Sequence, residues 1–156
     1  MRSLSISGAV PLDGPIDPAI LQAHLLDNMR NIEARDIRTK GSCIEFTGGY
    51  FRLVTNWNIL VPFGFGVLTV DFERRQVAYR LSYRQMAIFN VVIVVAMEMF
   101  FGVLLKAPSI GFLLALPFML LFAGFISVVT GRARFERFLR RVVTSCPLSV
   151  TSSSRG

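Results

Sequence analysis

Residues 91–105 read VVIVVAMEMFFGVLL, and this stretch decides the fold class because its only charged residue is Glu98. It belongs to a longer segment, residues 85–105, with no other charge, and residues 107–131 carry no charge at all. A helix of 21 residues spans about 31 Å, which matches the hydrocarbon core of a bilayer. In a chain of 156 residues, two such helices leave too little polar surface to cover them in a soluble fold. We therefore expect a transmembrane helical hairpin at residues 85–130, with spans over about 86–105 and 109–129.

The charge on Glu98 does not prevent insertion of the first span. Its Val, Ile, Leu and Phe residues contribute roughly −5 kcal/mol to insertion, against about +3 kcal/mol for one central charge. Two further residues stand out within the spans, the polar Asn90 and the helix-breaking Pro117. Because a carboxylate facing lipid is costly, we expect Glu98 to point into a protein contact or a wet cavity.

Three roles are open for Glu98. Folding the hairpin about Ala107 and Pro108 sets Glu98 opposite Leu116 and Pro117, where the missing proline N–H leaves a helix carbonyl without its donor. A protonated Glu98 could satisfy that carbonyl, which is the structural role. The other two roles are contact with a partner helix or cofactor, and lining of a pore or proton path.

The distribution of basic residues predicts the orientation of the hairpin. Of the 17 Lys and Arg residues, only Lys106 lies in the link between the spans. The positive-inside rule therefore places both termini in the cytoplasm, and we expect a multi-pass protein of a bacterial inner membrane. The first 14 residues have no apolar core of a signal peptide, so the first span should direct insertion. We assign the net charge of +7 mainly to topology and expect no nucleic-acid partner.

Residues 1–84 read as a small cytoplasmic α+β domain, an antiparallel sheet with one covering helix. Asp17 and Pro18 are typical of a helix start, and this helix should run to about Asn31. Alternating or apolar runs predict strands over residues 3–10, 35–39, 42–46, 50–54, 66–73 and 76–83.

The aromatic residues Trp57, Phe63 and Phe65 lie in a connection that is more apolar than a loop requires. One interpretation makes Phe63 and Phe65 core residues. The other places all three at the membrane surface or against a partner subunit, because aromatic rings favour the headgroup region.

Beyond the second span, residues 131–145 predict a basic amphipathic helix. Phe135, Phe138, Leu139 and Val142 recur at helical spacing. The other faces carry five arginines: Arg132, Arg134, Arg137, Arg140 and Arg141. This helix should lie on the anionic cytoplasmic leaflet or pack on the soluble domain. Residues 146–156, rich in serine, read as a disordered tail.

The sequence offers no catalytic motif. It has no nucleophile elbow, phosphate loop or paired-cysteine motif, and its single histidine, His24, has no ligand spacing to acidic or cysteine residues. We expect no enzymatic activity, no cofactor and no metal. Cys43 and Cys146 should remain reduced in the cytoplasm.

Two functional hypotheses follow from this pattern. The first is a non-enzymatic accessory or anchoring subunit of a larger membrane complex, with the aromatic connection and the basic helix as contact surfaces. The second is a homo-oligomeric pore or membrane-disrupting effector, gated by its cytoplasmic domain, in which Glu98 faces a central path. Across both hypotheses, the expected partners of the chain are the lipid bilayer and either a larger membrane complex or further copies of this chain.

Overall fold

The computed structural model describes residues 4–48, 60, 63–104 and 110–147. It combines one five-stranded sheet with three helices. In chain order the elements are β1 (Ser5–Pro11), α1 (Pro18–Asn31), β2 (Arg35–Lys40), β3 (Cys43–Thr47), β4 (Phe65–Asp71), β5 (Gln76–Ser82), α2 (Arg84–Leu104) and α3 (Ile110–Thr144). The α+β class is confirmed, and so are the predicted positions of α1 and of these five strands; the strand expected over 50–54 lies outside the described residues.

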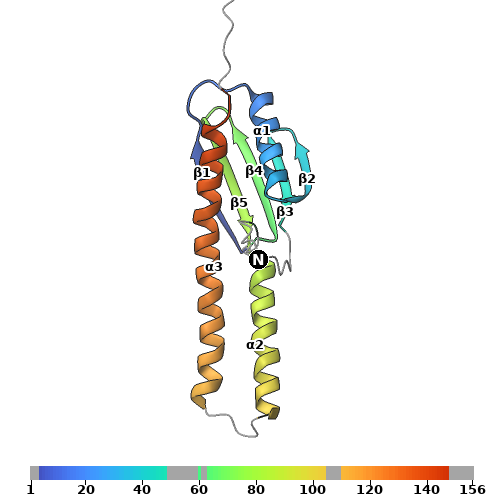
Figure 1. Ribbon diagram of the computed structural model, residues 1–156, viewed down its shortest axis with the longest axis vertical. Coiled ribbons are helices and arrows are strands. Elements are labelled where there is room, and N and C mark those ends of the chain that lie inside the picture. The colour runs from blue at the N-terminus through green and yellow to red at the C-terminus, as the bar shows by residue number, and fades with distance from the viewer. Residues whose placement is uncertain (1–3, 49–59, 61–62, 105–109, 148–156) are drawn as a thin grey trace, which may run out of the picture.

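The sheet is antiparallel throughout, with the strand order β1-β5-β4-β3-β2. Four strands follow one another as a meander, and β1 joins at the far side of β5. The chain therefore has to cross the sheet between β1 and β2, and α1 makes this crossing (Figure 1).

Helix α1 begins where the sequence predicts it. The Asp17 carboxylate accepts hydrogen bonds from the backbone N–H of Ala19 at 2.7 Å and of Ile20 at 3.4 Å, and Pro18 occupies the first helical position. Both features satisfy or avoid the unpaired donors of a helix start. Its apolar stripe, Leu21, Leu25 and Met29, is fully buried against the sheet.

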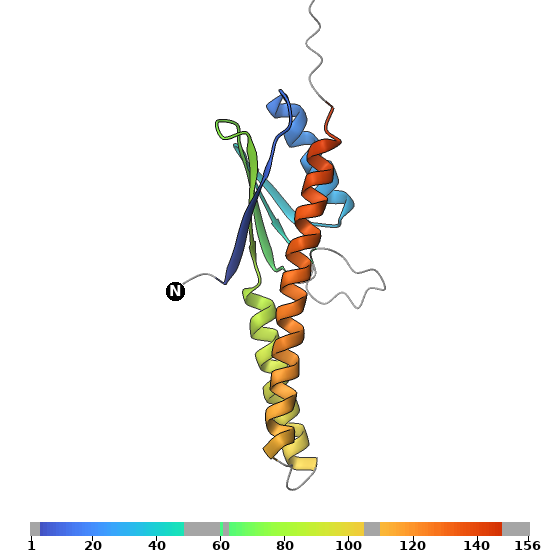
Figure 2. The same cartoon turned by 90° about the vertical axis from the view of Figure 1, so that its left-hand side faces the viewer.

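Two helices cover one face of the sheet, where the sequence predicted one. Figure 2 shows α1 and the C-terminal part of α3 side by side on this face, with the opposite face open. Helix α3 contributes Phe135, Leu139, Val142 and Val143 to the buried core. These side chains make α3 a second covering helix, because they pack on strand residues such as Tyr79. The ring centroids of Tyr79 and Phe135 are 5.5 Å apart.

Helix α3 is continuous for 35 residues and joins two segments that the sequence analysis separated at residue 131. Its inward-facing positions recur every three or four residues, through Gly124, Val128, Gly131, Phe135 and Leu139. One stripe thus serves two partners, first α2 and then the sheet. The side chain of Cys146 is 4% exposed, so the expected disordered tail does not begin at this residue; residues 148–156 lie outside the described part.

Helices α2 and α3 lie antiparallel and form a stalk that projects from the sheet domain (Figures 1 and 2). Within the described residues one helical segment, 117–144, is long and apolar enough to cross a membrane, and 11% of its apolar window is buried. A core helix of a soluble protein would be mostly buried. The structure therefore contains one helix that is compatible with a membrane span.

Candidate functional site

The contact between the two stalk helices is set by a polar residue and a glycine. Asn90 of α2 packs directly on Gly124 of α3, where even a methyl group would collide with the Asn90 amide. Small residues allow helix backbones to approach closely, and an amide between two apolar helices favours a protein contact over lipid. Asn90 was expected to be an intramembrane polar residue, and the structure assigns it to the α2–α3 contact.

Glu98 lies eight residues beyond Asn90 on α2 and is half-buried. The half-buried residues of α2 include Asn90, Val94, Met97 and Glu98, which share the side of the helix that faces α3. Rotation by about 100° per residue puts Glu98 at the margin of this side, about 80° from the direction of Asn90. No hydrogen bond or ion pair joins Glu98 to another of the described residues.

The level of Glu98 on α3 follows from the Asn90–Gly124 contact. Eight residues back from Gly124 is position 116, next to Pro117, which lies inside α3 and is half-buried. Glu98 of α2 and Pro117 of α3 therefore lie at about the same height in the stalk.

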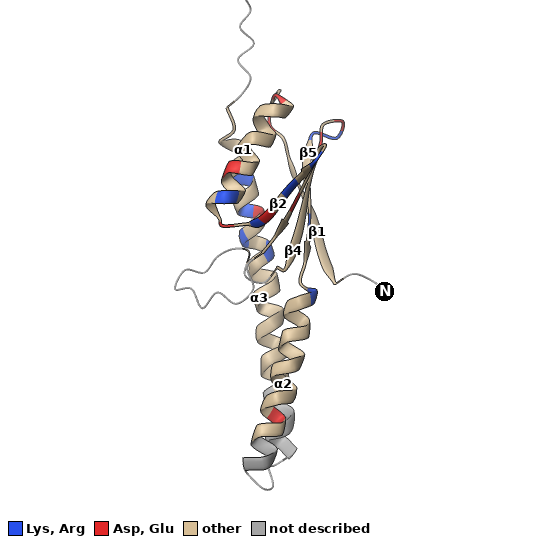
Figure 3. Ribbon diagram, turned by 90° about the vertical axis from the view of Figure 1, so that its right-hand side faces the viewer, with Lys and Arg blue, Asp and Glu red and all other residues tan. Residues whose placement is uncertain are grey.

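The outer surface of the stalk is apolar. Among the residues whose burial the structure describes, fourteen large apolar side chains on it are exposed by 36–70%: Ile88, Phe89, Val91, Val92, Val95, Met99 and Phe100 on α2, and Phe118, Met119, Leu121, Phe122, Phe125, Ile126 and Val129 on α3. In Figure 3 the described part of the stalk carries no basic residue below its junction with the sheet domain, and Glu98 is its acidic residue. On an ordinary soluble protein, exposed apolar side chains are scattered singly, whereas here they form a continuous surface on both helices.

The sheet meets the stalk at the end of β5. Ser82 ends β5 and Arg84 begins α2, so only Tyr83 separates the two elements. Ser82 is paired with Phe65 of β4 on one side and Ser5 of β1 on the other. The backbone N–H of Tyr83 also donates to the carbonyl of Leu4 at 3.0 Å. These residues form the end of the sheet domain that meets the stalk.

The three aromatic residues predicted to lie in the connection around the start of β4 differ in their environment. Phe63 is 1% exposed and belongs to the core, so of its two interpretations the structure favours the core residue over contact with a membrane surface or partner. Phe65 is 43% exposed, because it is the first residue of β4 and points to the open face of the sheet. Trp57 lies outside the described residues.

All five predicted arginines of α3 are exposed, but they occupy different heights. Arg132 and Arg134 follow immediately after the uncharged part of the helix. Arg140 and Arg141 lie about 12 Å further along the axis, beside the sheet. Of the two open placements for this segment, the structure favours packing on the soluble domain, since Phe135 and Leu139 of the same helix are buried in its core.

A polar cluster holds α3 to β5 within the sheet domain. The Tyr79 hydroxyl donates to Glu136 Oε2 at 3.4 Å, and Arg140 Nη2 donates to Glu136 Oε1 at 2.9 Å. The hydrogen bond from Arg140 lowers the pKa of the Glu136 carboxyl below its ordinary value of 4.5, against a smaller opposing effect of burial. No local sequence pattern indicates this cluster, because Tyr79 and Glu136 are 57 residues apart in the chain.

A second polar contact ties α1 to the end of α3. His24 Nε2 lies 3.1 Å from the Ser145 hydroxyl, and the Asn28 amide donates to the His24 carbonyl at 2.9 Å. This contact gives the single histidine a structural role. Beside it, burial raises the pKa of the Cys146 thiol, which makes that thiol less reactive.

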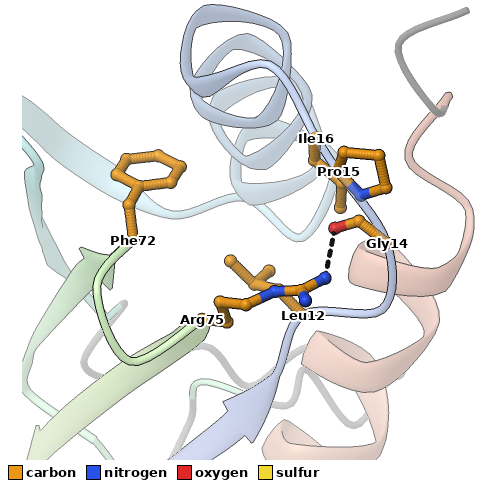
Figure 4. Close-up of a pocket in the computed structure, with 6 residues that line it drawn as sticks. All are labelled: Leu12, Gly14, Pro15, Ile16, Phe72 and Arg75. Carbon is orange, nitrogen blue, oxygen red and sulfur yellow. Dashed lines mark hydrogen bonds between the residues drawn. The ribbon is translucent and has the colours of Figure 1, made fainter.

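A small open cavity of about 310 Å³ lies at the end of the sheet domain furthest from the stalk. Its walls come from the segment after β1 and from the β4–β5 turn, and Arg75 Nη2 donates to the Gly14 carbonyl at 2.9 Å across it (Figure 4). With its guanidinium already engaged and few polar groups facing inward, the cavity has little to orient a ligand. Across the described residues, no group of three His, Cys, Asp or Glu side chains could hold a metal ion.

No protein-family model, curated protein or solved structure matches this chain.

Proposed function

We propose that this chain is a non-enzymatic integral membrane protein whose two-span hairpin anchors a cytoplasmic α+β domain beside a larger membrane complex. In this account α2 and the first part of α3 cross the bilayer, and both termini are cytoplasmic. Helix α2 has 21 residues and a length of about 31 Å, and the uncharged part of α3 has a similar length. Both match the hydrocarbon core of a bacterial inner membrane.

The observation that carries this proposal is the continuity of α3. The same helix presents exposed apolar side chains such as Phe118 and Phe125 in the stalk and buried ones such as Phe135 in the domain core. A domain joined by a flexible linker could turn freely above the membrane. Here the domain is tied to the stalk through α3 and also through the short β5–α2 junction, so its orientation relative to the bilayer is fixed.

A fixed orientation suits a docking role. The face of the sheet opposite α1 and α3 is open in Figure 2. Its middle row, Cys43, Thr69, Ala78 and Ala9, is formed of small side chains in register across four strands. The proposed anchor holds this flat face upright above the membrane surface, where a neighbouring subunit of a complex could pack on it.

The test is site-specific photo-crosslinking in native membranes. A photoreactive residue at Thr69, on the open face, should crosslink to one defined larger membrane protein, and the purified complex should contain the two in a fixed ratio. The matched control position is Asp27, an exposed residue of α1 on the helical side, which should give no such product.

The mass of the chain purified alone separates this proposal from the pore alternative. A mass of one or two copies of 17.4 kDa supports an accessory subunit. A stable ring of four or more copies, with Thr69 crosslinking only to other copies of this chain, would contradict it and favour the homo-oligomeric pore.

A further inference from the structure

Contacts of both stalk helices define the height at which the sheet domain meets the stalk. On the β5 side, Leu4 and Phe65 lie at the height of Ser82, two residues before Arg84. On the α3 side, the Asn90–Gly124 contact provides the reference. Asn90 is six positions after Arg84 on α2, and position 130 is six positions after Gly124 on α3.

Arg132 and Arg134 therefore lie only about 3–6 Å above the level of Arg84. The Tyr79–Glu136 hydrogen bond supports this alignment, because it brings the next turn of α3 beside the body of β5. Three cations from two helices thus lie within about 6 Å of one height, at the end of the stalk that joins the sheet domain.

This level carries both charge and apolar surface. Arg84, Arg132 and Arg134 are exposed, and Leu4 and Phe65 are 42% and 43% exposed although they lie in a folded domain. We call these five residues the membrane-end collar. Glu136, the next acidic residue along α3, accepts hydrogen bonds from Tyr79 and Arg140.

We propose that the membrane-end collar is a binding site for anionic phospholipid headgroups. This inference rests on the proposed bilayer-spanning stalk, which places the collar at the depth of the lipid phosphates. Guanidinium groups bind phosphate oxygens through paired, charge-assisted hydrogen bonds. Leu4 and Phe65 insert beside them at the boundary between headgroups and acyl chains, where apolar side chains of surface-bound segments are buried.

The site differs from the one expected from the sequence alone. The sequence pattern predicts one basic surface of five arginines on α3, whereas the structure places Arg140 and Arg141 about two helical turns beyond Arg132 and Arg134. Arg84, which belongs to the other helix, takes their place. The lipid site is therefore built across the α2–α3 pair.

The test is lipid binding to the full chain in detergent, followed by native mass spectrometry with phosphatidylglycerol and phosphatidylcholine. The collar variant carries Arg84→Gln, Arg132→Gln and Arg134→Gln. Each basic residue near an anionic surface contributes about fivefold in affinity, so this variant should bind phosphatidylglycerol about 100-fold more weakly. Its binding of phosphatidylcholine should change little.

The matched control carries Lys40→Gln, Arg74→Gln and Arg141→Gln, which removes the same charge from exposed positions far from the collar. It should bind phosphatidylglycerol like the native chain. A third variant with lysine at the three collar positions keeps the charge but loses the paired guanidinium geometry, so its affinity for phosphatidylglycerol should fall between those of the native chain and the glutamine variant. An affinity of the lysine variant equal to that of the native chain would contradict the role of the paired guanidinium contacts, so this variant keeps the test decisive if the glutamine variant does not fold.

Equal loss of binding in the collar and control variants would overturn the inference, since the effect would then follow net charge alone. So would equal affinity of the native chain for both lipids. The proposed span is tested separately by alkaline extraction of membranes. If the chain is extracted as a peripheral protein, the proposed function fails; if it stays inserted but shows no lipid preference, only the inference fails.

Discussion

Asn90 and Gly124 show how two residues define the geometry of the stalk. The glycine removes a side chain so that the asparagine amide can fill the space between the helices. A pair of apolar residues could pack equally closely, but it would not favour this alignment of α2 against α3 over others. The Asn90 amide does, because other alignments would expose it to an apolar environment. We therefore regard the pair as the residue-scale determinant of how α2 lies against α3.

A double-mutant cycle tests this pair. Gly124→Ala should destabilise the stalk by about 1–3 kcal/mol, because the added methyl group overpacks the contact with Asn90. In an Asn90→Ala background the same change should cost much less. Thermal unfolding of the full chain in detergent measures both, with Ala123→Val on the exposed side as control. Equal costs in both backgrounds would show that Gly124 meets something other than Asn90.

The Glu136 cluster makes a prediction about acid. Since its folded-state pKa is lowered, Glu136 contributes stability that is present above the ordinary value of 4.5 and is lost as the pH falls through the folded pKa. Glu136→Gln should therefore destabilise the chain at neutral pH by about 0.2–1 kcal/mol, the range for partly exposed ion pairs, and should flatten the acid side of the stability profile.

Denaturant unfolding across this pH range provides the measurement. Glu73→Gln, which removes an exposed carboxylate in the β4–β5 turn, is the control and should leave the profile nearly unchanged. A Glu136→Gln profile parallel to that of the native chain would contradict the assigned role of the Arg140 hydrogen bond.

At the scale of elements, the sequence predicted what depends on local chemistry. The Asp17–Pro18 helix start and the alternating strands β4 and β5 were correct because caps and side-chain alternation are local signals. The continuity of α3 was missed because the change from apolar to basic composition at Gly131 looks like a boundary. The spacing of inward-facing residues continues across Gly131 and could have revealed a single helix.

The sites were less predictable than the elements. Phe63 and Phe65 are two residues apart and chemically identical, yet one is buried and the other exposed. Phe65 is the first residue of β4 and points to the open face, whereas Phe63 lies before the strand, outside its side-chain alternation, and its backbone N–H donates to the carbonyl of Leu60. Similarly, the sequence pointed to Asn90 but not to Gly124, because their contact depends on how the two helices are aligned.

The role of α3 as part of the domain core predicts unequal costs for two neighbouring phenylalanines. Phe135→Ala should cost about 3–5 kcal/mol, since its fully buried ring packs on Tyr79 and stacks at 6.1 Å with Phe46. Phe138→Ala should cost clearly less because Phe138 is only partly buried. Hydrogen exchange of the sheet amides in each variant measures the loss. Similar effects would contradict the packing of α3 on the sheet.

At the scale of the whole molecule, the sheet domain and the stalk are joined twice, through α3 and through the β5–α2 junction. Neither connection contains a flexible linker in the described chain. A docking surface on the sheet and a lipid site on the collar would therefore be held at fixed positions relative to each other. This arrangement is the physical basis of the proposed anchoring role.

The central claim is that α2 and α3 cross the membrane as a hairpin with the sheet domain in the cytoplasm, and labelling of Ser109→Cys tests it most directly. Ser109 lies in the link between the two helices, whereas the native Cys43 and Cys146 belong to the sheet domain, so the native chain is its own control. In intact bacterial spheroplasts, a membrane-impermeant maleimide should label the Ser109→Cys variant and leave the native chain unlabelled. Labelling of Ser109→Cys only after the membrane is opened, or labelling of the native chain in intact spheroplasts, would contradict the account.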